Sequence, residues 1–370
     1  MSCELARSVT TVAEPLMFEK YLRSRIWGGD GLGRHLGKRV APDDTVGEAW
    51  EISTLPEHVS RVAGGSLDGE LLSALWTDAR FDLAGIAVAQ ELAMEERAGS
   101  LARSSRWTNT ESEAVADEFP WLVKWLDCRG SLSVQVHPKD SMARSVLGHP
   151  YGKSEAWVVV HVGPNARVST GLRMGLARDE LEKHLAEGTV EQCLHTYTPR
   201  EGDCILSPAG TVHTARDIIV AEIQQPSDAT FRLFDWNRLD EAGKMRTLHH
   251  ELGLQAIDWG QGPIRPVVPQ PLAVHGSGVR GETLLHSHWV RFERYLIERL
   301  WTSPHRGEMT VWMVLKGDAE LFDCARGSCR KLPRGSTILV PAAAGELHWA
   351  PQRTRRSCKL LCTRLPTADS

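Results

Sequence analysis

The feature that most constrains the fold is a segment in which two turns enclose a short apolar strand. Residues 202–213 read Gly-Asp-Cys-Ile-Leu-Ser-Pro-Ala-Gly-Thr-Val-His. The Gly-Asp pair predicts a tight turn, Cys-Ile-Leu-Ser predicts a strand, and Pro-Ala-Gly predicts a second turn that presents His213. Similar short β-like runs, separated by glycine and proline, recur after residue 119. The pattern predicts a mainly β protein built from jelly-roll barrels.

The expected elements follow from residue periodicity. The first barrel should contain strands at 122–126, 132–137, 156–162, 166–170, 204–207, 218–223 and 231–234. Helices are expected at 178–187, where Gly188 would be the C-terminal cap, and at 239–252. Two more helices, at 66–76 and 86–98, and a polar exposed loop would form a helical insertion at about 66–118.

The turn pattern occurs a second time near the C-terminus. Gly335 precedes Pro341 by the same interval that separates Gly202 from Pro208. Strands are expected at 289–300, 311–315, 320–322, 336–340 and 359–365, so the chain should contain two barrels. We expect a catalytic domain over residues 1–258, a proline-rich linker over 259–280 and a degenerate second barrel over 281–370.

Four side chains with metal-binding atoms fall at ordered positions in the first barrel: Gln135, His137, Glu155 and His213. Gln135 and His137 stand two apart in an expected strand, so both should point into one cavity. Two imidazoles, one carboxylate and one amide oxygen suit one zinc ion per chain, with a position left for water or substrate. Iron(II) and manganese are chemically possible competitors.

The second barrel lacks a comparable donor set. The residues after Pro341 read Ala-Ala-Ala-Gly-Glu-Leu-His, so the repeat is chemically degenerate and no second metal ion is expected. The remaining candidate ligands of this barrel are His286, His288, His305 and Glu308.

The bulk properties are those of an ordinary globular protein. The 370 residues are 42% hydrophobic and 24% charged, with a formal net charge of −4. This charge gives no reason to expect nucleic acid or a membrane as partner, and a phosphorylated ligand would need a local basic pocket. The first 20 residues lack a signal-peptide pattern, so we expect a cytoplasmic protein. We also expect the protein to be a monomer or a weak homodimer.

The eight cysteines form no Cys-x-x-Cys pair, which argues against a zinc ribbon or a redox motif. Cys128 and Cys204 lie in apolar runs and should behave as core residues. The pairs Cys324/Cys329 and Cys358/Cys362 are interpreted as reduced structural thiols rather than metal ligands.

Several motifs resemble those of known families. The segment at 202–213 resembles the second conserved motif of cupins, and the wider set is similar to the short bacterial form of type I mannose-6-phosphate isomerase. The matching stretches cover about two thirds of the chain in the family order. They are Trp-Gly-Gly at 27–29, Gly-Glu-Ala-Trp at 47–50, Phe-Pro-Trp-Leu-Val-Lys at 119–124, Leu-Ser-Val-Gln-Val-His-Pro at 132–138, Gly-Lys-Ser-Glu-Ala-Trp at 152–157, Pro-Ala-Gly-Thr-Val-His at 208–213, Ala-Glu-Ile-Gln at 221–224 and Ser-Asp-Ala-Thr-Phe-Arg-Leu-Phe-Asp-Trp at 227–236.

The resemblance implies a zinc-dependent isomerase that interconverts mannose 6-phosphate and fructose 6-phosphate through a cis-enediolate, with zinc on the four donors above. It also implies an active-site arginine at Arg232. Without the resemblance, Arg232 would be interpreted as a residue that forms a structural ion pair with Asp228 or Asp235. Sugar-phosphate contacts are implied for Trp27, Glu48, Lys124, Ser133, Lys153 and Glu222.

Two questions stay open at this stage. The general base is one of Glu48, Glu222 and Lys153, all chemically suitable. The competing functions are an iron-dependent cupin oxygenase and a non-catalytic sugar-phosphate-binding protein. Lys153 stands two residues before Glu155 and should point into the same cavity if that segment is extended.

Overall fold

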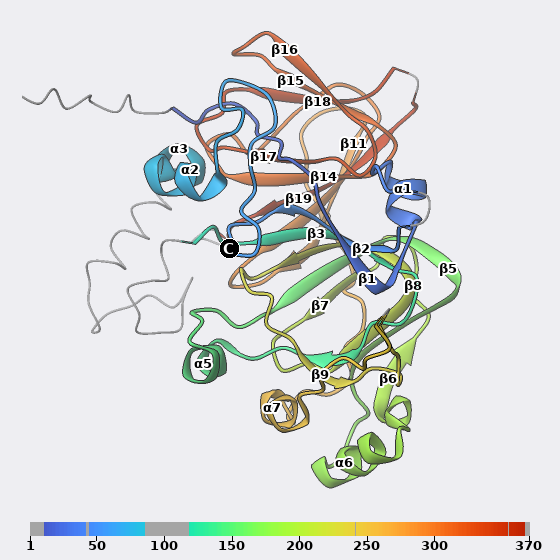
Figure 1. Ribbon diagram of the computed structural model, residues 1–370. Coiled ribbons are helices and arrows are strands. Elements are labelled where there is room, and N and C mark those ends of the chain that lie inside the picture. Colours follow the sequence, from blue (N-terminus) through green and yellow to red (C-terminus); the bar gives the residue numbers. More distant parts are fainter. Residues whose placement is uncertain (1–10, 42–43, 86–117, 241, 354, 367–370) are drawn as a thin grey trace, which may run out of the picture.

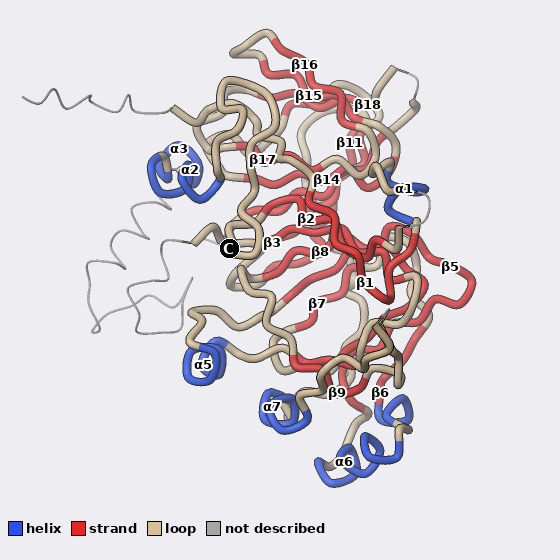
Figure 2. The backbone as a smooth tube through the Cα atoms, in the orientation of Figure 1, coloured by secondary structure: helices blue, strands red, loops and turns tan. Residues whose placement is uncertain are grey.

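A computed structural model describes residues 11–41, 44–85, 118–240, 242–353 and 355–366 of the chain. Strands form the centre of the molecule and helices lie at its margins (Figure 2). The strands are arranged in three sheets with antiparallel pairing. The prediction of a mainly β protein is therefore confirmed.

The first sheet contains nine strands, and the long β5 (Glu155–Leu172) pairs with three of them. Residues 156–162 and 166–170, expected as two strands, belong to this one strand, since the Gly-Pro-Asn between them shifts the register without ending it. The main path runs β1 (Tyr21–Gly29), β2 (Val46–Ile52), β3 (Leu122–Cys128), β8 (His213–Gln224), β4 (Val134–Val136) and β9 (Phe231–Phe234), while β5 also pairs with β6 (Leu194–Tyr197) and β7 (Cys204–Ser207).

Two further sheets form the second barrel, which lies at the opposite end of the molecule from α5, α6 and α7 (Figure 1). The six-stranded sheet runs β10 (Gln270–Leu272), β11 (Val279–His286), β12 (Arg291–Ile297), β19 (Cys358–Arg364), β14 (Thr310–Lys316) and β17 (Thr337–Val340). The four-stranded sheet runs β13 (Trp301–Thr302), β18 (Leu347–Pro351), β15 (Ala319–Asp323) and β16 (Ser328–Leu332).

The repeated turn has the same backbone conformation in both barrels. Gly202 has φ 93° and Gly335 has φ 84°, in the left-handed region that glycine adopts with little strain. Each glycine precedes a short buried strand, β7 or β17. The sequence repeat therefore reflects a repeated structural unit.

The helices of the described residues are short, from three residues in α5 to ten in α6. Helix α6 (Arg178–Glu187) is confirmed with Gly188 as its left-handed cap at φ 70°. Of the helix expected at 66–76, only the part from Leu72 onward is helical. In the described part of the chain, the other helices are α1 (Gly31–Leu36), α2 (Leu72–Asp78), α3 (Arg80–Ala84), α5 (Asp140–Met142), the π-helix η2 (Ala143–Leu147), the 3₁₀ helix η3 (Val190–Cys193) and α7 (His250–Ala256).

The prediction of a helix at 239–252 is wrong for most of this range, because α7 begins only at His250. The Asp240 side chain accepts hydrogen bonds from the backbone of Ala242 and Lys244 and so stabilises a turn. The helix expected at 86–98 and nearly all of the loop up to residue 118 lie outside the described residues.

One hydrophobic core joins the first sheet to the second barrel. It contains Trp125 and Ile219 from the first sheet and Phe292 and Leu361 from the second barrel. The Trp125 indole N–H also donates to Thr337 Oγ1 across the two parts, at 3.3 Å. The two barrels are therefore packed against one another through buried side chains.

The proline-rich segment runs along this junction with backbone contacts to both barrels. Ile264 donates to the Thr170 carbonyl at 3.0 Å, and Val267 donates to the Cys204 carbonyl at 2.7 Å. Strand β10 then pairs with β11. The segment is thus an ordered connection, and the domain boundaries expected from the sequence stay a prediction.

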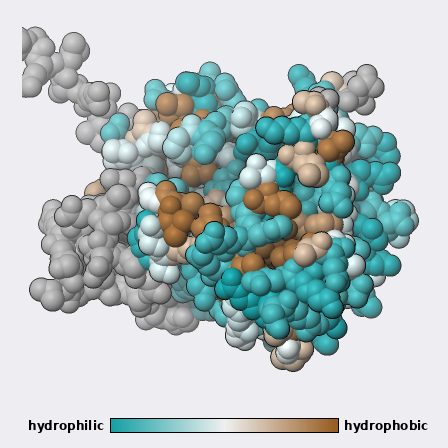
Figure 3. Space-filling model, turned by 60° about the horizontal axis from the view of Figure 1, so that its bottom comes forward, coloured by the Kyte–Doolittle hydropathy of each residue, from teal (hydrophilic) through white to brown (hydrophobic). Residues whose placement is uncertain are grey.

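Cys128 and Cys204 are buried in the core, as expected. The face shown in Figure 3 is mostly hydrophilic, with hydrophobic residues in a few separate patches. None of the helices in the described part of the chain is long and apolar enough to cross a membrane.

Candidate active site

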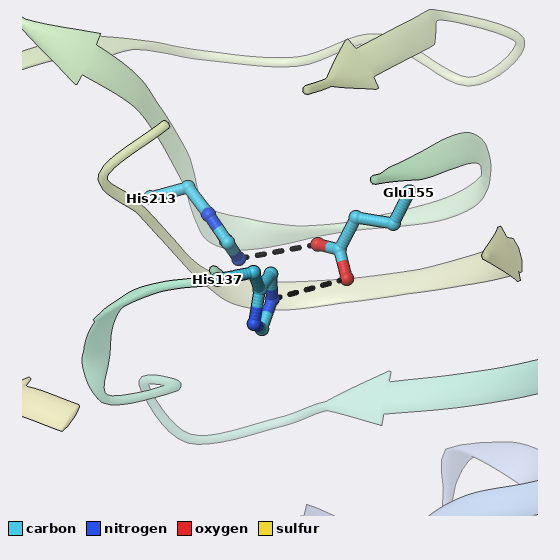
Figure 4. Close-up of side chains that lie close together, drawn as sticks. All are labelled: His137, Glu155 and His213. Atoms are coloured by element: carbon cyan, nitrogen blue, oxygen red, sulfur yellow. Dashed lines mark ion pairs between the residues drawn. The ribbon is translucent and has the colours of Figure 1, made fainter. Parts of the chain in front are cut away.

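Three of the predicted metal ligands converge where strands of the first sheet begin or end (Figure 4). His137 follows β4, Glu155 begins β5 and His213 begins β8. The Glu155 carboxylate lies 3.2 Å from His137 Nε2 and 3.1 Å from His213 Nε2. All three side chains are buried, so the candidate ligand atoms face one another inside the protein.

Gln135, the fourth predicted ligand, lies beside this group. The sheet places Gln135 opposite both His213 on β8 and Arg232 on β9. Its side-chain amide lies 3.1 Å from His213 Nε2, and its Oε1 accepts a hydrogen bond from Ser133 at 3.0 Å. Because either end of an amide can be turned toward a neighbour, Gln135 is within reach of an ion held by the other three residues.

The hydrogen bonds of the two histidines set their tautomers. His137 Nδ1 lies 2.8 Å from the Ala229 carbonyl, and His213 Nδ1 lies 2.9 Å from the Thr211 carbonyl. A neutral imidazole that donates from Nδ1 leaves the Nε2 lone pair free for a metal. Burial, together with Lys153, lowers the pKa of His137 to about 4, which favours this neutral form.

Glu155 supplies the negative charge of the group. Burial alone would raise the pKa of Glu155, but the pKa is held well below its usual range, and the charge of Lys153 is the largest of the opposing causes. Neither carboxylate oxygen receives a well-oriented hydrogen bond from the described residues. A buried ionised carboxylate facing two Nε2 lone pairs is a donor set that fits a divalent cation.

Lys153 approaches the same carboxylate and confirms the expected orientation of its side chain. Its Nζ lies 2.7 Å from Glu155 Oε2 and 3.2 Å from His137 Nε2. Burial would lower the pKa of Lys153, but Glu155, Glu222 and Asp228 raise it above its ordinary value. Lys153 is therefore held protonated beside the candidate metal ligands.

A cavity of about 470 Å³ adjoins this group, and two of the three carboxylates that line it, Glu48 and Glu222, differ in character. Glu48 receives hydrogen bonds from Arg25 and the Trp50 indole, both at 2.7 Å. Although burial acts against it, Lys124 and Arg25 lower the pKa of Glu48. Burial, with the charge of Glu155, instead raises the pKa of Glu222 to about 7.

Arg232 also lines the cavity, from β9. Its Nη1 donates to the Thr247 carbonyl at 3.0 Å, and its buried Nε has no hydrogen-bond partner in the described part of the chain. Asp228 and Asp235, the two ion-pair partners proposed for Arg232 from the sequence, pair with other cations instead. Asp228 pairs with Arg23 and Lys124. Asp235 pairs with Arg238 and Arg246. Its guanidinium is thus available to an anion in the cavity.

The structure brings all the predicted substrate contacts to this one cavity. Its lining includes Trp27, Glu48, Lys124, Ser133, Lys153 and Glu222, as well as Gln135 and Arg232. The placement agrees with the sequence-based set, and the roles of the individual residues stay predictions.

Sequence reasoning missed three arginines of the same cavity: Arg23, Arg25 and Arg246. Arg23 lies over the Trp50 ring, 4.6 Å from its centroid, and pairs with Asp228 at 3.3 Å. The alternation of Arg23, Arg25 and Trp27 along one strand was a signal that could have placed two of them on the same face. Arg246 has no such local signal, because it lies in an irregular segment.

The two jelly-roll barrels and the buried His–Glu–His group beside a charged cavity define a cupin-type protein with a candidate metal centre. The chain is 30% identical over 337 residues to the mannose-6-phosphate isomerase ManA of Bacillus subtilis, covering 90% of this chain and 95% of that protein. It is 32% identical over 251 residues to the mannose-6-phosphate isomerase of Streptococcus mutans, covering 68% and 70% of the two chains. The chain belongs to the mannose-6-phosphate isomerase family and is an isomerase.

The solved structures with a similar fold include isomerases of the same name. A crystal structure of the mannose 6-phosphate isomerase from Bacillus subtilis superposes with a TM-score of 0.78 at 24% identity, covering 95% of this chain and 99% of that one. A putative mannosephosphate isomerase from Archaeoglobus fulgidus gives 0.67 at 20% identity, covering 96% and 99%. No family model matches the sequence.

Proposed function

We propose that this protein interconverts mannose 6-phosphate and fructose 6-phosphate through a cis-enediolate, with one zinc ion in the first barrel. The observation that carries the proposal is the buried group of His137, Glu155 and His213, which adjoins a cavity rich in cationic side chains. The names of the relatives support mannose 6-phosphate as the substrate.

Gln135, His137, Glu155 and His213 would hold the zinc ion. Their two Nε2 atoms, one carboxylate and one amide oxygen leave a position open to the sugar. Zinc, when bound, polarises the sugar oxygens as a Lewis acid and lowers the cost of the negative charge that develops during isomerisation. Lys153 keeps Glu155 ionised and so maintains the charge of the ligand set.

Glu222 is the best candidate for the proton-transfer base. Isomerisation moves a proton between C1 and C2, so the base must exchange a proton near neutral pH. A pKa of about 7 suits Glu222 to this role. Glu48 is held by Arg25 and Trp50, and Lys153 is kept protonated, so neither is as well placed to accept a proton.

The arginines of the cavity can divide the two anionic parts of the substrate between them. Arg232 would steady either the enediolate or the phosphate, as its fork-shaped donor suits both. Arg25 and Arg246 are further cations at the cavity wall, and we propose them as phosphate contacts in addition to the residues expected from the sequence. Anchoring the phosphate fixes C1 and C2 relative to the base.

The decisive experiment is incubation of the zinc-loaded protein with mannose 6-phosphate, followed by a coupled assay for fructose 6-phosphate. The wild type should turn over, and Glu222→Gln should lose at least about 100-fold in kcat. Glu282→Gln is the control, because Glu282 pairs with Arg294 away from the cavity. Oxygen consumption by iron-loaded protein would indicate an oxygenase, and binding of the sugar phosphate without turnover would indicate a binding protein.

We also propose the domain division that the sequence suggested: residues 1–258 carry the site and 281–370 form the degenerate second barrel. All the cavity residues named above precede residue 258, which supports this division.

A further inference from the structure

A second group of chemically active side chains lies inside the C-terminal barrel. Glu293 and Tyr295 belong to β12, Cys362 belongs to β19, and His305 lies in the segment between β13 and β14. The candidate ligand atoms of Glu293, His305 and Cys362 all lie within 4.8 Å of one another. Glu293, Tyr295 and Cys362 are almost fully buried.

The two oxygens of Glu293 have separate surroundings. Oε1 faces the arginines, at 3.1 Å from Arg364 Nη2 and 3.0 Å from Arg291 Nε. Oε2 faces the other way, at 2.9 Å from His305 Nε2 and 2.7 Å from the Tyr295 hydroxyl. The carboxylate can therefore keep its arginine partners through Oε1 while Oε2 binds a cation beside His305.

The His305 imidazole lies between two carboxylates. His305 Nδ1 lies 3.8 Å from the Glu308 carboxylate, which is in turn fixed by Arg364 at 3.0 Å. A carboxylate on the Nδ1 side of an imidazole leaves Nε2 turned toward the metal and raises its basicity. In this barrel Nε2 points at Glu293 Oε2 and lies 3.1 Å from Tyr295 Oη.

A route from solvent to the group is present. A cavity of about 710 Å³ is lined by Glu293, Tyr295 and His305 together with Arg291 and Arg364. Two of the three donor residues thus border a space large enough for a hydrated ion and a small ligand.

From this geometry we propose that Glu293, His305 and Cys362 form a second divalent-metal site, selective for a borderline-soft cation such as Zn²⁺ or Co²⁺. An imidazole, a carboxylate and a thiolate are ligands that such cations accept in tetrahedral sites. Binding displaces two protons to solvent, the thiol proton of Cys362 and the Nε2 proton through which His305 pairs with Glu293 Oε2. This site is separate from the proposed catalytic zinc and contradicts the expectation of one ion per chain.

The ligand chemistry provides a specific test. The first-barrel donors are nitrogen and oxygen only, whereas the second site includes sulfur. Titration of the metal-free full-length protein with Co²⁺ should therefore produce a thiolate-to-cobalt charge-transfer band in the near ultraviolet, complete by two equivalents in the wild type and by one equivalent in His213→Ala. His213→Ala should keep this band, since it alters only the first site. Absence of the band from the wild type would overturn the proposal.

Matched variants assign the band to its residues. Cys362→Ser should abolish it and leave isomerase turnover intact, while Cys324→Ser, in an exposed group with Glu346 and His348, should keep it. Loss of the band in Cys324→Ser and not in Cys362→Ser would overturn the assignment. If Cys362→Ser does not fold, His305→Gln serves instead: a weakened band and at least about tenfold weaker Co²⁺ binding support the proposal, and unchanged binding contradicts it.

Discussion

At the residue scale, the two histidines of the first barrel act through the hydrogen bonds on their far side. The carbonyls of Ala229 and Thr211 accept from Nδ1 and thereby turn Nε2 toward Glu155. A buried carboxylate between two protonated imidazoles would be an ion-pair cluster, whereas between two neutral imidazoles it is a cation site. The backbone at these two positions thus determines the chemistry of the group.

Replacing Arg232 by lysine should damage turnover much more than folding. Lysine keeps the charge but loses the planar two-pronged donor, and loss of one such transition-state contact costs on the order of 100-fold in rate. Steady-state kinetics and thermal unfolding of Arg232→Lys would measure the two effects. Near-normal kinetics would reduce Arg232 to a structural residue.

Arg246 should contribute to recognition of the phosphate. Arg246→Gln is expected to narrow the preference for mannose 6-phosphate over mannose by about tenfold or more, because a buried anion loses a charged donor. Arg238→Gln is a matched control, since Arg238 pairs with the same Asp235 but does not line the cavity. Equal effects of the two variants on the sugar preference would show that Asp235 pairing, not phosphate contact, is responsible.

The same assay tests the sequence-based expectation that Lys153 serves the phosphate. Its contact with Glu155 at 2.7 Å favours a role at the metal ligands. Lys153→Ala should then lower zinc affinity and leave the preference for mannose 6-phosphate over mannose nearly unchanged. A smaller preference in this variant would show that Lys153 contacts the phosphate.

At the scale of elements, the turns that begin short strands set the arrangement of both barrels. Gly335 is the more constrained of two glycines with φ 84°: a Cβ there would lie 2.5 Å from the Leu36 carbonyl, whereas Gly307 has open space. Gly307→Ala should cost about 1–2 kcal/mol from backbone strain alone. Gly335→Ala should cost at least about 3 kcal/mol, because the clash adds to that strain. Equal unfolding free energies for the two variants in urea would contradict this.

The connection between β3 and α1 should make stability depend on pH. Asp127 accepts a hydrogen bond from Gly31 N at 2.6 Å, and burial raises its pKa from 3.8 to about 6. The raised pKa means that the protonated form favours folding, so this contribution is present in acid and is lost as pH rises through about 6.

Asp127→Asn cannot ionise and keeps an acceptor for Gly31. The difference in Tm between Asp127→Asn and the wild type should therefore grow in favour of the variant between about pH 4 and about pH 6 and stay constant above about pH 7. Glu182→Gln, from the exposed ion pair with Arg178 on α6, is the control for loss of one negative charge. A Tm difference that does not change with pH would show that Asp127 ionises equally in the folded and unfolded chain.

At the scale of the whole molecule, the shared core should keep the barrels folded without metal. Chelation is expected to abolish isomerase activity while near-ultraviolet circular dichroism changes little, because Trp125, Phe292 and Leu361 are packed independently of the ligands. His213→Ala should lower the zinc content by one equivalent per chain. Unchanged zinc content in this variant would show that the ligand set is wrong.

Local sequence determined the parts of this protein that depend on a few neighbouring residues. Helix α6 with its Gly188 cap, the turns at Gly202 and Gly335, and the motifs that bring His137, Glu155 and His213 together could be predicted, as could strands β3, β4, β5, β7, β8, β9, β12, β14, β15, β17 and β19. The residue pattern predicts no range for β1, β2, β6, β10, β11, β13, β16 and β18. Alternation and turn chemistry act over short distances, and the family motifs supplied the long-range pairing.

Tertiary structure alone decided which distant side chains share a cavity. Arg246 lines the first-barrel cavity from an irregular segment, and the turn at Asp240 delays α7 to His250 although the sequence suggests an earlier start. Glu293, His305 and Cys362 converge only because β12 pairs with β19 and the segment after β13 folds over them. Such contacts depend on strand order and register, which are set by burial of the whole core and leave no local pattern in the sequence.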